Sequence, residues 1–269
     1  MKEAIKSVLP LAVRTRLKWA GYALKDIVSP ISQPRVPKRR DTFVGGGDFV
    51  GVGDAFLESL KRHGVTPDTQ ILDVGCGQGR MARPLAEFLS EEGGYLGFDV
   101  VKAGVDWCRS HYSDLPNFRF EHADVFNARY NPDGTVRADE YTFPAETGEF
   151  DFAFLTSVVT HMFQRDVEHY ISEVSRSLKP GGRCLITWFL LNEQSEAATS
   201  PRLHFRHNVD AVSKTTLVDN PEAAIAFSEN WVRSVYLKHG LTIETVEYGI
   251  WSNPQSEFDF QDTIIARKA

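Results

Sequence analysis

The chain has little cysteine and no long apolar run. Its 269 residues include three cysteines, Cys76, Cys108 and Cys184, and none of them forms a close pair with another. An odd, scattered set argues against a disulfide framework and indicates a reducing compartment. No run of about 18 apolar residues predicts a membrane span, and no signal-peptide pattern with a cleavage site is evident. We therefore expect a cytoplasmic protein.

Two kinds of catalytic site also lack their signatures. No spacing of His, Cys, Asp and Glu is typical of a metal site, and no glycine–serine elbow indicates a Ser/His/Asp nucleophile. We expect no bound metal. The length favours one α/β domain with inserts over two full domains, and a hydrophobic content of 42% is ordinary for a globular protein.

Positive charge is concentrated at the amino-terminal end. Residues 1–40 contain ten Lys and Arg against two acidic residues, whereas residues 41–269 contain 20 basic and 34 acidic residues. The acidic body argues against a nucleic acid partner. Apolar residues at helical spacing predict a basic amphipathic helix within residues 1–28, followed by a proline-rich connector over residues 29–40. This helix would contact a membrane surface, cover a substrate site as a lid, or simply pack on the domain.

The stretch from Ile71 to Arg80 has glycine at every second position: Ile-Leu-Asp-Val-Gly-Cys-Gly-Gln-Gly-Arg. A short apolar strand, a glycine loop and then a helix are typical of nucleoside binding at the carboxyl end of a first strand. A dinucleotide fingerprint requires a third small residue where this chain has Arg80. Asp73 is also an awkward neighbour for a pyrophosphate. Arg80 thus departs from the dinucleotide pattern, and Asp73 favours a ligand with an ammonium group and no phosphate, such as S-adenosylmethionine (SAM).

This stretch resembles motif I of the class I SAM-dependent methyltransferases. Further pieces that resemble the family follow in the same order: Tyr95–Asp99, Phe118–Asp124, Phe150–Ser157, and the segment Leu178–Gly182 with the apolar run after it. Each piece is weak alone, but the ordered set extends over about residues 69–191. The resemblance implies a SAM-dependent enzyme.

The resemblance also implies the fold. We expect an α/β, Rossmann-like three-layer sandwich with a seven-stranded, mostly parallel sheet whose last strand is antiparallel and lies between the fifth and sixth, plus the amino-terminal helical arm. Alternating apolar segments predict strands near 69–74, 95–99, 118–123, 150–155, 183–190, 241–248 and 261–267. Helices are predicted near 54–63, 79–90, 101–112, 164–178 and 227–239.

Several positions match cofactor positions of the family. By that resemblance Asp99 would hold the ribose, Asp124 the adenine edge, and the glycine loop the methionine part of SAM. Asp73 would influence the ammonium group, and Arg80 would reach the carboxylate. The complete set expected to bind the cofactor is Asp73, Gly75, Cys76, Gly77, Gly79, Arg80, Asp99, Val100, Asp124, Val125 and Thr156. Cys76 is interpreted as a small filler and not as a nucleophile.

Two inserts and one glycine-rich segment are candidates for the acceptor site. The insert near 127–148 contains the turn signal Asn131-Pro-Asp-Gly134 and predicts a small hairpin. The insert near 192–226 lies where a loop would cover the ligand crevice; its Arg202, His204 and Arg206 would receive an anionic group or form a solvated basic loop. The segment from Phe43 to Gly53 predicts a flexible joint or a closing hinge that brings Phe43 and Phe49 near the substrate.

His161 follows the fourth predicted strand, where an acceptor would approach the methyl group. Histidine suits a general base because its ordinary pKa lies near neutrality, although a structural hydrogen bond is an equal use for it. We therefore expect methyl transfer to an oxygen, or a nitrogen, of a small-molecule acceptor. A non-catalytic or membrane-associated SAM-fold module and an NAD-dependent oxidoreductase remain as alternatives.

Overall fold

The computed structural model describes residues 26, 28, 33–39, 42, 48–198, 202–253, 255–256 and 259–269. Phe43 lies outside these ranges, and so do most residues of the basic arm, residues 1–40. Of the expected membrane contact through residues 1–28, only residues 26 and 28 are described. Within them, no helix has the length and apolar character needed to cross a membrane.

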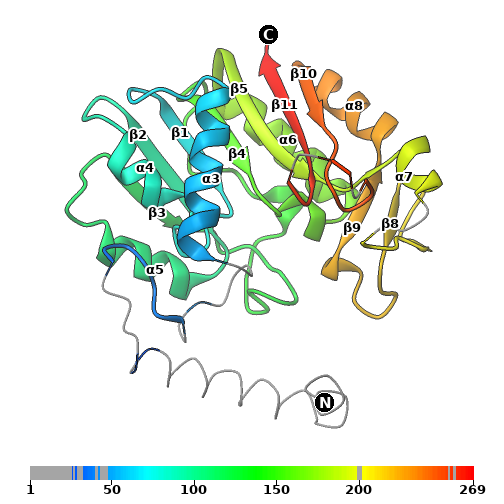
Figure 1. Ribbon diagram of the computed structural model, residues 1–269, viewed down its shortest axis with the longest axis horizontal. Coiled ribbons are helices and arrows are strands. Elements are labelled where there is room, and N and C mark those ends of the chain that lie inside the picture. Colours follow the sequence, from blue (N-terminus) through cyan, green and yellow to red (C-terminus); the bar gives the residue numbers. More distant parts are fainter. Residues whose placement is uncertain are drawn as a thin grey trace.

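A seven-stranded sheet forms the centre of the fold (Figure 1). Its order is β10-β11-β5-β4-β1-β2-β3. The last strand is antiparallel to both of its neighbours, and the pairs β5–β4, β4–β1, β1–β2 and β2–β3 are parallel. The expected sheet, with its last strand inserted antiparallel, is confirmed. The strands are β1 Gln70–Val74, β2 Gly94–Asp99, β3 Phe118–His122, β4 Phe150–Leu155, β5 Leu178–Trp188, β10 Leu241–Glu247 and β11 Asp262–Lys268.

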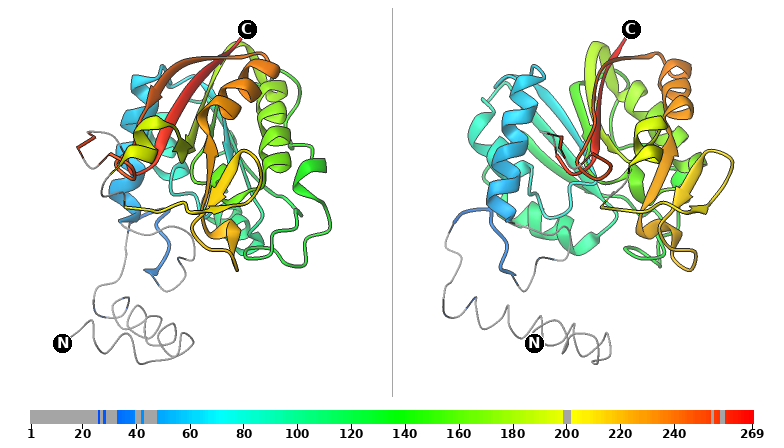
Figure 2. Two further views of the ribbon diagram at one scale, coloured as in Figure 1. Left: turned by 90° about the vertical axis from the view of Figure 1, so that its right-hand side faces the viewer. Right: turned by 45° about the vertical axis from the view of Figure 1, so that its right-hand side comes forward.

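Helices cover both faces of this sheet (Figure 2). One face packs against α3 (Phe49–Arg62), α4 (Ala82–Phe88) and α5 (Lys102–His111). The other face packs against α6 (Gln164–Ser177) and α8 (Glu229–Lys238). Each face has its own cluster of buried side chains, so the fold is the expected three-layer sandwich.

Alternation along β1 assigns neighbouring side chains to opposite faces. Ile71 belongs to the core beneath α3, α4 and α5, whereas Leu72 and Val74 belong to the core beneath α6 and α8. Successive side chains of a strand point to opposite sides. Asp73 therefore shares the face of Ile71, which decides what its carboxyl group can reach.

Some predicted boundaries were wrong. Strand β5 begins at Leu178, five residues before the predicted start, because the Lys-Pro-Gly-Gly segment continues the strand and its pairing with β4 shifts between Phe150 and Phe152. Helix α8 begins at Glu229, later than predicted, because the preceding residues form strand β9 (Ile225–Ser228).

The insert near 192–226 contributes to a second, four-stranded sheet in the order β6-β9-β8-β7. The strands of this sheet are β6 Leu190–Leu191, β7 His207–Asn208, β8 Ser213–Thr215 and β9. The helix α7 Glu193–Ala197 and the 3-10 turn η4 Pro221–Ala223 lie between them in the chain. Asp262, at the start of β11, accepts hydrogen bonds from Leu190 N, Gly249 N and the Trp251 indole N–H. This buried carboxyl group fastens β6 of the second sheet, and the connection between β10 and β11, to the main sheet.

The insert near 127–148 is a compact loop and not a hairpin of regular strands. The predicted turn is present, since Gly134 N donates to Asn131 O, but pairing is limited to single bridges. The 3-10 turn η2 (Ala138–Glu140) follows. The turn is polar and the insert has few apolar residues, so no apolar face stabilises two longer paired strands.

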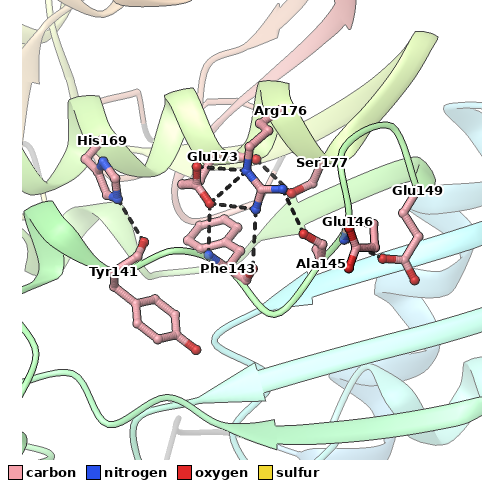
Figure 3. A network of polar contacts seen from close by, with 9 residues as sticks. All are labelled: Tyr141, Phe143, Ala145, Glu146, Glu149, His169, Glu173, Arg176 and Ser177. Atoms are coloured by element: carbon pink, nitrogen blue, oxygen red, sulfur yellow. Dashed lines mark hydrogen bonds and ion pairs between the residues drawn. The ribbon is translucent and has the colours of Figure 1, made fainter.

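Helix α6 holds the second half of this insert through a polar network (Figure 3). Glu173 accepts from Phe143 N at 2.9 Å and pairs with Arg176 at 2.7 Å, while Arg176 donates to Ala145 O at 2.8 Å. His169 Nε2 lies 2.8 Å from Tyr141 O. The network keeps the Tyr141 and Phe143 rings against Phe98 of β2, with centroids 5.9 and 4.8 Å away.

Helix α3 begins at Phe49, five residues before its predicted start, so this part of the glycine-rich segment is helical and is not a joint or hinge. Asp48 caps the helix by accepting from Val50 N. Gly53 serves close packing: a Cβ there would lie 2.6 Å from the Arg80 carbonyl oxygen and 3.5 Å from Pro84 Cδ. The glycine allows α3 to approach the start of α4.

We predict that Gly53→Ala lowers the free energy of unfolding by about 1–3 kcal/mol, the usual cost of forcing atoms into a packed contact. Gly51→Ala is the matched control, because its Cβ would meet only the end of the Asp48 side chain, at 2.7 Å. Alanine also favours a helix over glycine. Urea unfolding of both variants checks the prediction, and equal stability of the two would contradict it.

Candidate functional site

A cavity of about 580 Å³ lies where β1, β2 and β4 end at their carboxyl ends. This is the edge at which open α/β sheets bind ligands. The β3–β4 insert contributes Asn127, Arg129, Tyr130 and Ala138, and the second insert contributes Glu222. The remaining lining residues are Val74, Gly75, Phe98, Asp99, Val100, Val101, Val125, Phe126, Thr156, Ser157, Val158, His161, Met162, Asp166 and Tyr170.

The glycine loop bends sharply between β1 and α4. Gly75, Gly77 and Gly79 all have left-handed backbones, with φ of 82°, 56° and 72°. Such angles favour glycine. A Cβ on Gly75 would lie 2.5 Å from a methyl carbon of Val158 at the cavity wall. Gly75 N and Cys76 N both donate to Phe98 O, which fastens the loop to β2.

Asp99 connects this loop to the end of β2. One carboxylate oxygen accepts from Gly77 N at 2.8 Å and the other accepts from Val101 N at 2.7 Å. Burial raises the pKa of Asp99, and the two backbone donors oppose that rise. A carboxylate oxygen has more than one acceptor site, so the cavity-lining carboxylate retains capacity for hydroxyl donors. This arrangement fits a ribose diol.

Asp73 does not line the cavity. It is 1% exposed and accepts a hydrogen bond of 2.5 Å from the Tyr95 hydroxyl, on the same face of the sheet as Ile71. Burial is the main reason that the pKa of Asp73 rises to about 8, against the opposing bond from Tyr95. Its expected influence on an ammonium group stays a prediction. This geometry does not place the Asp73 carboxyl group in direct contact with a ligand in the cavity.

The other expected cofactor residues lie in the cavity lining, in the loop behind it, or away from the cavity. Val100, Val125 and Thr156 line the cavity together with Gly75 and Asp99, whereas Cys76, Gly77 and Gly79 form the loop behind it. The Asp124 carboxylate accepts from the Thr135 hydroxyl at 2.5 Å and does not line the cavity. The Arg80 guanidinium lies over the Phe49 ring, 5.6 Å from its centroid, so these two candidates contact each other and not the cavity.

His161 ends the 3-10 turn η3 (Val159–His161) and lines the cavity. Its Nδ1 lies 2.7 Å from the Glu222 carbonyl oxygen. A carbonyl only accepts hydrogen bonds, so Nδ1 carries a proton and Nε2 of the neutral ring has a free lone pair. Burial lowers the pKa of His161, the bond to Glu222 opposes this, and Arg129 adds to it. The imidazole is therefore neutral at pH 7.

The predicted basic group of the second insert lies elsewhere. The side chains of Arg202, His204 and Arg206 are exposed, and none lines the cavity. The insert reaches the cavity through Glu222 instead, because η4 is the part that meets η3. The insert was expected to form much of the acceptor pocket, but Glu222 is the only one of its described residues that lines the cavity. A binding role of the three basic residues stays a prediction.

Sequence reasoning missed the residue that shapes the end of β4. Ser157 lines the cavity with a left-handed backbone at φ 57°. Its N–H donates to the Thr187 hydroxyl, and its own hydroxyl donates to Gln261 Oε1, both at 2.8 Å. Left-handed serine is uncommon and indicates a constraint imposed by surrounding structure. No local signal reveals it, because Thr187 lies in β5 and Gln261 directly precedes β11, both far from Ser157 in the chain.

Comparisons with known proteins agree with this geometry. A methyltransferase-domain family model matches residues 72–186. The chain is 25% identical over 166 residues to sterol 24-C-methyltransferase of Schizosaccharomyces pombe, covering 59% of this chain and 40% of that protein. It is 28% identical over 137 residues to an O-methyltransferase of Pyrenophora dematioidea, covering 51% and 45%.

The resemblance of this region to the class I SAM-dependent methyltransferases is thereby confirmed. Among solved structures, a SAM-dependent methyltransferase from Mesorhizobium loti matches with a TM-score of 0.52 and 17% identity, covering 80% of this chain and 98% of that one. The family implies SAM as the methyl donor, which decides against the NAD alternative. The matched region spans less than half of the two curated relatives, and these act at different atom types by their names.

We predict that Asp73→Asn flattens the pH dependence of stability. The folded-state pKa of about 8 exceeds the unfolded value of 3.8. The folded protein therefore retains a proton that the unfolded chain releases, and the stabilisation present at low pH is lost as pH rises toward 8. The slope from one such group reaches about 1.4 kcal/mol per pH unit.

Urea unfolding between pH 5 and 8 measures this slope. The exposed carboxylate Asp106 pairs with Lys102, so Asp106→Asn is the control that should retain the wild-type decline in this range. Parallel curves for wild type and Asp73→Asn would show that the buried carboxyl group is not protonated.

Proposed function

We propose that the protein transfers the methyl group of SAM to an oxygen or nitrogen atom of a small-molecule acceptor, with His161 as general base. The observation that carries the proposal is one cavity holding both Asp99 and a neutral histidine whose Nε2 is unprotonated. Bound SAM supplies an electrophilic methyl group on a sulfonium. The acidic charge of the body supports a small molecule over a nucleic acid.

The residues of this chain would act in two ways. The glycine loop and Asp99 hold the donor against the ends of β1 and β2, and the segment from Thr156 to His161 faces the acceptor. An acceptor hydroxyl or protonated amine must lose a proton as its bond to carbon forms, and Nε2 of His161 takes that proton. Alignment supplies several kcal/mol, and a positioned base adds a factor of about 10²–10⁴.

The three cysteines support the expected reducing compartment. All are free and buried, and burial raises the pKa of each thiol. High pKa values leave thiols unreactive, so a structural role for Cys76 as a filler in the glycine loop fits its surroundings.

Calorimetry with S-adenosylhomocysteine tests the cofactor part. We predict that Asp99→Ala weakens binding by about 5- to 150-fold, the equivalent of the 1–3 kcal/mol lost with a charged hydrogen bond. The control is Asp106→Asn on the exposed side of α5, which should bind as wild type does. A wild-type protein that fails to bind would favour the alternative of a non-catalytic module.

A second prediction concerns His161→Asn, whose amide retains a donor toward the Glu222 carbonyl but provides no base. Methyl transfer should fall by about 10²–10⁴-fold while S-adenosylhomocysteine binding is unchanged. The assay follows labelled methyl transfer from SAM to a panel of small phenols, alcohols and amines.

The pH profile provides a further check on the same variant. Because burial lowers the pKa of His161, the loss of wild-type activity toward acid pH should have its midpoint below the pKa of an ordinary histidine, and this loss should be absent from His161→Asn. Transfer at the wild-type rate by the variant would assign His161 a structural role.

A further inference from the structure

The segment Gln33–Arg39 is docked on the domain by Arg35. The Arg35 guanidinium pairs with Asp114 at 2.5 Å and lies over the Tyr112 ring, 5.3 Å from its centroid. Its side chain is 17% exposed, and the residue has a left-handed backbone with φ 58°. A non-glycine residue in this conformation is sustained by its contacts. The ion pair and the ring contact are therefore specific anchors and not incidental surface contacts.

Tyr112 connects this anchor to the glycine loop. The ring is 1% exposed, and its hydroxyl donates to the Gly79 carbonyl oxygen at 3.1 Å. A Cβ on Gly79 would lie 3.0 Å from the same hydroxyl oxygen and 3.1 Å from Cys108 Sγ. The tyrosine therefore supports the last glycine of the loop from the side opposite the cavity.

A continuous path of contacts results. Arg35 covers one part of the Tyr112 ring, and the Tyr112 hydroxyl holds Gly79. Gly79 N in turn donates to Cys76 O within the loop, at 2.9 Å. Arg35 touches no residue of the cavity lining, so any influence on a ligand would pass through Tyr112.

We infer that Arg35 and Tyr112 are positioning residues for the cofactor loop, and that docking of the segment Gln33–Arg39 is coupled to SAM binding. The inference rests on the proposed role of the glycine loop in holding SAM. Coupling between two sites is reciprocal. If the docked segment stabilises the ligand-binding form of the loop, bound ligand must stabilise the docked segment by the same factor.

Calorimetry with S-adenosylhomocysteine on the full chain tests the first half. Arg35→Ala and Tyr112→Phe should each weaken binding by about 5-fold or more, although neither residue touches the ligand. Arg35→Lys retains the charge without the flat guanidinium and should restore part of the loss. The double variant should lose less than the product of the single losses, because both changes break one path.

Arg119→Ala is the matched control, since Arg119 of β3 forms an exposed ion pair of the same length with Glu149 and not with the glycine loop. It should bind S-adenosylhomocysteine as wild type does. Circular dichroism and thermal unfolding of each variant establish that a change in affinity is not a failure to fold.

Limited trypsin digestion tests the reciprocal half. Saturating S-adenosylhomocysteine should slow cleavage after Lys38 and Arg39 in wild type and should have no such effect in Arg35→Ala. If Arg35→Ala and Tyr112→Phe bind as wild type does while Asp99→Ala loses affinity, the inference is overturned and the proposed function stands. If the wild-type protein itself fails to bind, both are overturned.

Discussion

The carboxylate of Asp99 is the interaction on which the site depends. It accepts backbone donors from both Gly77 and Val101 and so joins the glycine loop to the end of β2. Burial raises the pKa of this carboxyl group, and the two backbone donors oppose that rise together with His122 and Val100. The same residue thus shapes the glycine loop and lines the cavity in which we propose that a ribose diol binds.

Around this centre, the two inserts act differently. The first is held on α6 by the network of Glu173 and Arg176, which packs its aromatic rings against β2. The second builds a small sheet and contributes the Glu222 carbonyl that orients His161. The inserts therefore contribute to the walls of the cavity and fix the tautomer of His161, whereas the seven-stranded sheet forms the floor of the cavity.

Much of the fold was predictable because its signals are local. Each strand is a short apolar run, and the glycine loop has a pattern that few other structures require, so strand order followed from the family resemblance. Boundaries were predicted wrongly where two interpretations compete: Lys-Pro-Gly-Gly is typical of a turn but continues β5, and Gly51 and Gly53 indicate a joint but belong to α3. Pairing with β4 and contact with Arg80 decided those cases.

The sequence by itself determined the glycine loop, the acids at the ends of the first strands and the position of His161 after β4, because these depend on residues near one another in the chain. Only tertiary structure decided which side chains reach the cavity. Asp73 and Val74 are adjacent, yet strand alternation turns one toward Tyr95 and the other toward the cavity. Contacts between distant segments, such as Arg35 with Tyr112 and Ser157 with Gln261, have no local signal and arise only when the sheet and its layers assemble.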